Sequence, residues 1–273
     1  MRLTVKVTAR QDFASAARDA ALITAIACAC LMPVNAKAIS DEIQVYTDDI
    51  SRPGEFGLEL HVNTTPKGRS TPDYPGDSPP QHGVRFTPEF SYGIDKDWEA
   101  GLYLPTVREA NGTFSASGVK LRMKWLPLKP NEDTGGWYFG SNLELSSVNA
   151  RYSESRYGSE LRVMAGYHAQ EWHVAVNPIF ELDLSRGHRS GGPDFELATK
   201  AVHDIAHGIA LGAEYYAGLG KFNHPLPRPM QEHTLYLVMD YDHKPWVFNF
   251  GIGRGLNGAT DRWTTKAIFD VPF

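Results

Sequence analysis

The sequence predicts an all-β fold, an antiparallel transmembrane β-barrel of about 12 strands. Three observations support this prediction. Segments of roughly ten residues alternate between apolar and polar side chains from residue 55 to the end, as strands with two different surroundings do. The connections between these segments alternate between short and long. No run of 18 apolar residues outside the N-terminus could form a membrane-spanning helix.

Residues 1–38 have the features of a cleaved signal peptide. Basic residues precede an apolar stretch at 20–32, and Ala36 and Ala38 fit a small-x-small cleavage site. The alternatives are an amphipathic helix of a cytoplasmic protein, a start codon further downstream, and a lipoprotein signal ending at Cys28 or Cys30. Both cysteines lie in this leader, so the mature chain would contain no thiol for a zinc site or a Cys nucleophile.

The mature chain is acidic. The leader holds five basic and two acidic residues, so its removal changes the net charge from −5 to −8. Nucleic-acid-binding proteins carry basic surfaces, and we therefore expect no nucleic-acid partner. Residues 39–54 are acidic and end at Pro53-Gly54; we interpret them as either a periplasmic lead-in or a plug in the lumen. The barrel is expected to occupy residues 55–273.

The first six strands are expected at 55–63, 82–94, 98–106, 113–126, 136–149 and 157–168. Apolar residues take most even positions in the first three and most odd positions in the next three. The fourth is the clearest, because residues 119–125 read Val-Lys-Leu-Arg-Met-Lys-Trp. A period of two over this length indicates a strand with one apolar and one polar face.

The last six strands are expected at 171–184, 193–202, 208–218, 232–242, 246–256 and 262–273. Apolar residues fall on even positions in the first and fifth of these and on odd positions in the others. The last strand ends with Phe269, Val271 and Phe273 on one face. This ending resembles the assembly signal of Gram-negative outer-membrane β-barrel proteins. The resemblance implies outer-membrane lipid and the barrel assembly machinery as partners.

The connections support the same topology. Those after the second, sixth, eighth and tenth strands have two to five residues, whereas most of those after odd-numbered strands are longer and rich in Gly, Pro and Ser. Short periplasmic turns and long outer loops are typical of outer-membrane barrels. The six tryptophans lie near strand ends, as in the aromatic girdles of membrane proteins. Counts of ten or fourteen strands are alternatives to twelve, and a soluble β-barrel or sandwich is an alternative to a membrane protein.

The N-terminal part of the mature chain carries a second resemblance. Its residues 41–46, Asp-Glu-Ile-Gln-Val-Tyr, and 53–63, Pro-Gly-Glu-Phe-Gly-Leu-Glu-Leu-His-Val-Asn, are similar to the start of exported proteins grouped with the meta-pathway phenol-degradation (MetA-type) transport family. The resemblance implies a porin-like or transport role for small organic compounds, and it transfers no catalytic residue.

The polar faces of the strands would form the lumen of a membrane barrel. The candidate lumen-lining residues are Glu59, His61, Arg85, Glu89, Lys120, Arg122, Lys124, Glu144, Arg162, His173, Glu181, Glu196, Lys200, Glu214 and Asp240. Because the basic residues concentrate at 120–124, we expect a basic wall facing carboxylates such as Glu144, Glu181 and Glu214 across a narrow pore. A small polar or charged solute is then the expected partner, and the MetA-type resemblance extends this expectation to aromatic compounds. The alternative is an interior in which the charges pair and fill the barrel.

The sequence contains no strong catalytic or cofactor motif, so we expect no enzyme, no cofactor and no metal. His203 and His207 have the spacing of a zinc-binding helix, but too few residues join the flanking strands, and a turn is expected. His61 or His173 with Ser91, Ser141 or Ser146 would be needed for a lipid hydrolase at the barrel rim. That enzyme, a closed structural or adhesion barrel without conductance, and a soluble periplasmic binding barrel are the alternative functions.

Overall fold

The computed structural model describes residues 42–131, 133–188 and 191–272. The expected signal peptide and Phe273 of the assembly signal lie outside these ranges. No helix within them is long and apolar enough to cross a membrane. The strands are β1 (Phe56–Lys67), β2 (Val84–Gly93), β3 (Trp98–Tyr103), β4 (Thr106–Arg108), β5 (Phe114–Ala116), β6 (Gly118–Leu128), β7 (Gly136–Val148), β8 (Tyr157–His168), β9 (Trp172–Asp183), β10 (Asp194–Ala206), β11 (Ile209–Lys221), β12 (His224–Pro225), β13 (Glu232–His243), β14 (Trp246–Gly255) and β15 (Trp263–Asp270), with one short 3-10 helix, η1 (Arg228–Met230).

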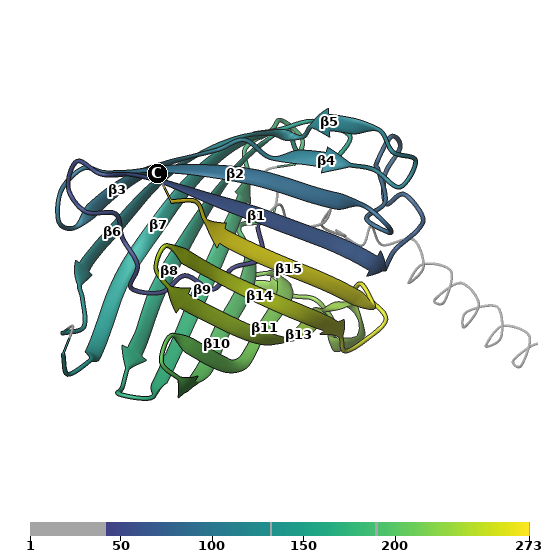
Figure 1. The fold of residues 1–273 in the computed structure, drawn as a ribbon. Coiled ribbons are helices and arrows are strands. Elements are labelled where there is room, and N and C mark those ends of the chain that lie inside the picture. Colours follow the sequence, from purple (N-terminus) through teal and green to yellow (C-terminus); the bar gives the residue numbers. More distant parts are fainter. Residues whose placement is uncertain (1–41, 132, 189–190, 273) are drawn as a thin grey trace, which may run out of the picture. The chain divides into compact units, whose positions relative to one another are not determined.

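The described strands form a closed antiparallel barrel with 12 strands around its wall (Figure 1). Each wall strand pairs with its neighbours in sequence, and β1 pairs with both β2 and β15. In the closing pair, Leu60 lies opposite Phe269 and Val62 opposite Ala267. Closure gives every edge a partner, which backbone groups in contact with lipid require. The predicted fold class and strand count are confirmed.

The two ends of the barrel differ in their connections. Turns of two to seven residues join β2 to β3, β6 to β7, β8 to β9, β10 to β11 and β13 to β14, and we call this the short-turn end. Longer segments join β1 to β2, β7 to β8, β9 to β10 and β11 to β13, and we call the opposite end the long-loop end. β4 continues the line of β3 beside β2, β5 pairs with β4, and β12 lies in the connection from β11 to β13.

The distribution of side chains is the inverse of that in a soluble barrel. Large apolar residues point outward; Leu237 in the middle of β13 exposes 72% of its surface and Leu121 in β6 exposes 58%. Charged and amide side chains on the same strands are buried inside, as Lys124 in β6 is. All six tryptophans are exposed: Trp98, Trp125, Trp137, Trp172, Trp246 and Trp263. An apolar outer band with aromatic residues near the strand ends fits lipid as the surrounding medium.

Several expected strand boundaries are wrong. The third and fourth strands each divide, into β3 and β4 and into β5 and β6. Pro105 stands at the first break and has no N–H to donate to the sheet, so pairing resumes only at Thr106. The eighth strand continues to Ala206 instead of ending at residue 202, because Gly208 adopts a positive φ of 65° and allows a tight turn. His203 therefore lies in a strand and His207 in the turn, as expected for a segment without a helix.

Candidate functional site

The inward faces of the strands carry a large set of ionisable side chains. The residues predicted to line the lumen all lie at inward-facing positions. Eight of them are buried: His61, Arg85, Glu89, Arg122, Lys124, Glu144, Arg162 and Glu214. The other seven are partly buried: Glu59, Lys120, His173, Glu181, Glu196, Lys200 and Asp240. Contact of these groups with a passing solute stays a prediction.

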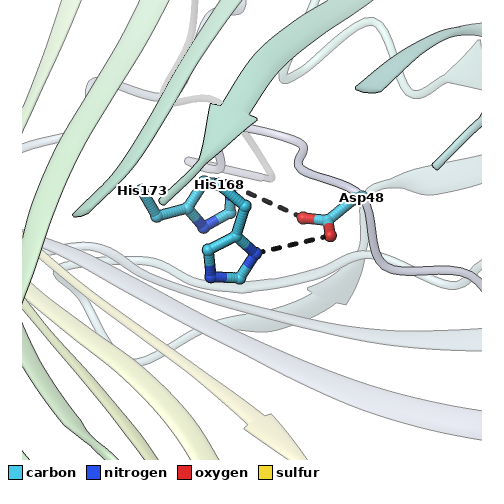
Figure 2. Close-up of side chains that lie close together, drawn as sticks. All are labelled: Asp48, His168 and His173. Atoms are coloured by element: carbon cyan, nitrogen blue, oxygen red, sulfur yellow. Dashed lines mark ion pairs between the residues drawn. The ribbon is translucent and has the colours of Figure 1, made fainter. Parts of the chain in front are cut away.

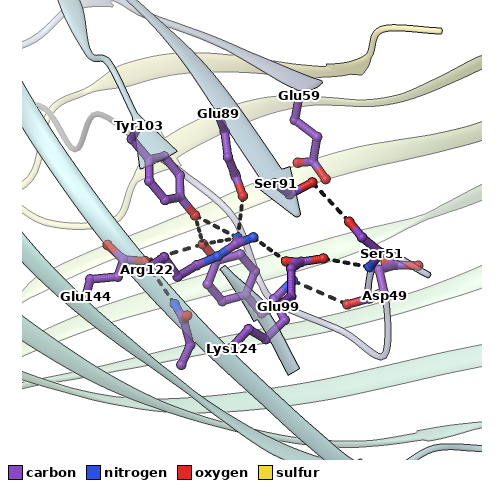
Figure 3. Close-up of polar contacts among 12 residues, drawn as sticks. Asp49, Ser51, Glu59, Glu89, Ser91, Glu99, Tyr103, Arg122, Lys124 and Glu144 are labelled. Carbon is purple, nitrogen blue, oxygen red and sulfur yellow. Dashed lines mark hydrogen bonds and ion pairs between the residues drawn. The ribbon is translucent and has the colours of Figure 1, made fainter. Parts of the chain in front are cut away.

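Arg122 of β6 is the centre of a buried ion-pair network. Its guanidinium forms ion pairs with Glu89 of β2 and Glu99 of β3, and donates a hydrogen bond to the Tyr103 hydroxyl at 2.8 Å (Figure 3). Gly101 is the register partner of Arg122, and a Cβ at this position would lie 2.8 Å from Arg122 Nε. The absence of a side chain on Gly101 therefore lets the guanidinium cross β3 and reach β2.

The two lysines of β6 also have partners on adjacent strands. Lys124 Nζ lies 3.5 Å from Glu99 Oε1, and Lys120 Nζ lies 3.6 Å from Glu144 Oε2. The cations of β6 therefore pair with carboxylates of β2, β3 and β7, and the basic wall facing carboxylates across a pore stays a prediction. A buried charge without a partner costs several kcal/mol, and cross-strand neighbours are the nearest partners available.

A second buried network joins β10, β11, β13 and β15. Lys266 and Glu214 form an ion pair in which the two side chains are 0% and 1% exposed. Lys200 Nζ lies 2.7 Å from Asp240 Oδ2 and 3.7 Å from Glu214 Oε1. The Tyr216 hydroxyl donates a hydrogen bond to Glu214 Oε2 at 2.7 Å. The negative charge of Glu214 is thus compensated by Lys266 of β15 and Lys200 of β10.

The segment 42–53, which precedes β1, is bound to the inner wall through Tyr46. The Tyr46 amide donates to Asn177 Oδ1 at 2.7 Å, and Asn177 Nδ2 donates back to the Tyr46 carbonyl at 3.0 Å. The Tyr46 and Tyr103 hydroxyls lie 2.6 Å apart. The period of two places Asn177 and Tyr103 on inward faces, so the sequence pattern could have identified them. No pattern in the sequence indicates the position of Tyr46.

Other residues of the segment contact different parts of the wall. Ile43 packs with residues of β10, β11 and β13, whereas Val45 packs with residues of β7, β9 and β10. The Gln44 carbonyl accepts a hydrogen bond from Arg162 at 2.7 Å. The Ser51 amide donates to Glu99 Oε2 at 2.6 Å. Segment 42–53 is therefore held along its length by apolar and polar contacts with several strands.

Cationic side chains surround the ring of Tyr46. The guanidinium carbon of Arg162 lies 4.5 Å from the ring centroid, Lys124 Nζ lies at 5.0 Å and the guanidinium carbon of Arg122 at 5.7 Å. Such contacts are attractive because the face of an aromatic ring is negative. Tyr46 therefore connects segment 42–53 to the cations of β6 and β8.

Asp48, His168 and His173 form a further polar group, at the short-turn end, which we call the His–Asp cluster (Figure 2). Asp48 Oδ1 lies 3.5 Å from His173 Nε2, and Asp48 Oδ2 lies 3.7 Å from His168 Nδ1. Burial raises the pKa of the Asp48 carboxyl. Asp48 and His168 line a cavity of about 920 Å³.

The long-loop end holds a smaller cavity, of about 340 Å³, lined in part by Glu109 and Arg151. Both nitrogens Nε and Nη2 of Arg151 donate to the Glu109 carboxylate, and Tyr152 donates to its Oε1 at 2.9 Å. The hydrogen bond from Arg151 lowers the pKa of Glu109 below its usual value. This contact ties the loop after β4 to the loop after β7.

Three of the candidate hydrolase residues, His61, His173 and Ser91, have other hydrogen-bond partners in the described structure. His61 Nε2 lies 3.0 Å from Glu89 Oε2, and His173 Nε2 lies 3.1 Å from the Tyr138 hydroxyl. Ser91 Oγ lies 3.0 Å from Ser51 Oγ. None of these contacts pairs a serine with a histidine that could act as its base. The expectation that the protein is not an enzyme stays a prediction.

Comparisons with solved structures identify the class of fold. An outer-membrane channel from Pseudomonas putida F1 matches with a TM-score of 0.57 and 12% sequence identity, over 85% of this chain and 100% of that chain. The KdgM porin matches with a TM-score of 0.54 and 9% identity, over 80% of this chain and 99% of that chain. No family model and no curated protein matches the sequence.

The chain thus has the closed antiparallel barrel fold of these outer-membrane channels. The predicted class and location agree with the fold, with the apolar outer face and with these structures. Membership of the MetA-type family stays a prediction, as do the cleaved signal and the contact with the barrel assembly machinery.

Proposed function

We propose that the barrel passes small polar or charged solutes, aromatic ones included, across the outer membrane. In this proposal, segment 42–53 and the ion pairs around Arg122 form the narrow part of the pathway. The observation that carries the proposal is the inverted distribution of side chains, with an apolar outer face and buried ionic groups inside. Barrels of eight strands are filled by side chains and those of 16–18 strands hold an aqueous channel, so 12 strands leave room for a restricted path.

The same proposal includes the route of export. Residues 1–38 would direct the chain through the inner membrane and be removed. Phe269 and Val271, followed by Phe273, would then present the outward apolar ending to the barrel assembly machinery. The short-turn end faces the periplasm in this orientation, and the long-loop end faces the exterior.

The test is the conductance and ion selectivity of the purified barrel in planar bilayers. The wild-type protein should give discrete single-channel steps. The triple variant K120Q/R122Q/K124Q removes three positive charges from the interior, so its reversal potential in a salt gradient should shift toward cation selectivity. The matched control K67Q/K96Q/R108Q makes the same change of net charge at three exposed positions and should leave the reversal potential near that of the wild type.

Two outcomes would reject parts of the proposal. A folded barrel that gives no conductance with any solute would favour the closed structural or adhesion barrel. Equal reversal potentials for the wild type and the interior triple variant would remove Lys120, Arg122 and Lys124 from the pathway while leaving conduction intact. Folding of every variant is checked by its heat-modifiable migration in gels.

A further inference from the structure

The β8–β9 hairpin places two imidazoles side by side at the short-turn end. His168 and His173 are register partners across the turn, and both lie at inward-facing positions. Register partners of an antiparallel pair have Cβ atoms about 4.5–5.5 Å apart, and these two rings stack with centroids 4.4 Å apart. The hairpin alone therefore supplies two nitrogen ligands at one place.

A carboxylate from a distant part of the sequence completes the group. Asp48 comes two residues after Tyr46, whose backbone is fixed to β9 by both hydrogen bonds with Asn177. This anchor brings the Asp48 carboxylate to the start of β9, with one oxygen near each histidine (Figure 2). The three ligand atoms all lie within 4.8 Å of one another.

We propose that Asp48, His168 and His173 bind a divalent transition-metal ion, with Zn²⁺ as the best fit, and that the ion fastens segment 42–53 to the β8–β9 hairpin. Around a tetrahedral ion with bonds of about 2.1 Å, two ligand atoms lie roughly 3.4 Å apart. The two nitrogen–oxygen distances, each to a different oxygen of Asp48, are 3.5 and 3.7 Å, and all three ligand atoms lie within 4.8 Å, so the side chains must draw together to hold one ion. Two imidazoles with one carboxylate suit Zn²⁺, Cu²⁺ or Ni²⁺ better than Mg²⁺ or Ca²⁺, which prefer oxygen ligands.

The surroundings of the cluster allow an ion to enter. The cavity of about 920 Å³ beside Asp48 and His168 gives access to ions and leaves space for water as a further ligand. Asp49 adds a second carboxylate to the same cavity. The Tyr138 hydroxyl lies 3.1 Å from His173 Nε2, and ion binding replaces this hydrogen bond.

The other group of potential ligands, Glu59, His61 and Glu89, is less suited to a metal ion. Glu89 already forms an ion pair with Arg122, so a cation is present at this carboxylate. A metal ion there would be repelled by the guanidinium. Within the described residues, the ion pairs of Asp48 are those with the two histidines, and no arginine pairs with the His–Asp cluster.

The experiment measures binding of Zn²⁺ to the untagged, folded mature barrel in detergent micelles by calorimetry. We expect one ion per chain for the wild type, and a dissociation constant raised at least about tenfold in D48N and in H168A. The control variant H207A/H243A removes another pair of neighbouring histidines at the same end and should bind Zn²⁺ like the wild type. Equal affinity in the wild type, D48N and H168A would overturn the proposal, as would the absence of binding to the wild type.

A second measurement tests the role of the ion as a fastener. Zn²⁺ should slow proteolytic cleavage within residues 42–53 in the wild type and not in D48N, although D48N retains both histidines. Equal protection of the two proteins by Zn²⁺ would overturn this role. Neither measurement depends on conductance, so a barrel that binds zinc but passes no current would reject the proposed function alone.

Discussion

Replacement of Tyr46 by alanine should release segment 42–53 from the barrel wall. The side chain is 2% exposed and contacts three cations and the Tyr103 hydroxyl. Burial of an aromatic side chain stabilises by about 2–3 kcal/mol, each cation–π contact by about 0.5–2 and the hydrogen bond by about 1. The bound position of the segment should therefore lose on the order of 5 kcal/mol, which lowers the equilibrium constant between the bound and released segment by roughly 10³-fold or more.

Two assays report this release. Protease cleavage within residues 42–53 should become faster in Y46A, and the single-channel conductance should increase because the segment no longer fills the interior. Y46F keeps the ring and its cation contacts, and Arg122 still donates to Tyr103, so this variant should behave much like the wild type. Y157A is the matched control, since Tyr157 is 47% exposed on the outer face. Unchanged cleavage and conductance in Y46A would refute the reasoning.

Two further predictions concern the ionic contacts at other places in the barrel. K266M leaves the buried Glu214 carboxylate with one cationic partner and should lower the free energy of unfolding by about 3–5 kcal/mol. The midpoint of urea unfolding in lipid vesicles measures this loss. The double variant E214Q/K266M should recover part of it. The hydrogen bond from Arg151 lowers the pKa of Glu109, so the contact stabilises the folded loops fully above the unfolded pKa of about 4.3. This stabilisation is lost as the pH falls through the lower pKa that Glu109 has in the folded protein. Cleavage by an acid protease at the loop 149–156 should therefore rise below about pH 4 in the wild type and be high at every pH in E109Q; a pH-independent wild type would contradict this.

The wall of the barrel could be predicted from the sequence because each strand is recognised from its own residues alone. Each strand needs apolar residues toward lipid and polar ones inward, so a period of two appears in any window that contains the strand. Residues 119–125 are an example, since Val119, Leu121 and Met123 are exposed and Arg122 and Lys124 are buried. Predicted strand boundaries were wrong where a single residue changes the backbone conformation, as at Pro105 and Gly208.

The contacts of the interior could not be predicted in the same way. Arg122 reaches Glu89 only because Gly101 stands between them, and this depends on the register of three strands. Asp48 and His173 are far apart in the sequence, and no periodicity connects them. Register and the path of a segment without regular structure are set by tertiary contacts, which a single sequence does not display.

The position of Tyr46 connects the size of the proposed pathway with its charge. Arg122, Lys124 and Arg162 all lie against its ring, so segment 42–53 covers three positive groups while it occupies the interior. Displacement of the segment would therefore widen the path and uncover these cations at the same time. In that case conductance and anion preference rise together in Y46A, because uncovered cations attract anions in a space of low dielectric. A segment that only filled space would change conductance and leave selectivity as it was, so the correlation between the two quantities separates a passive filler from a charge-covering constriction.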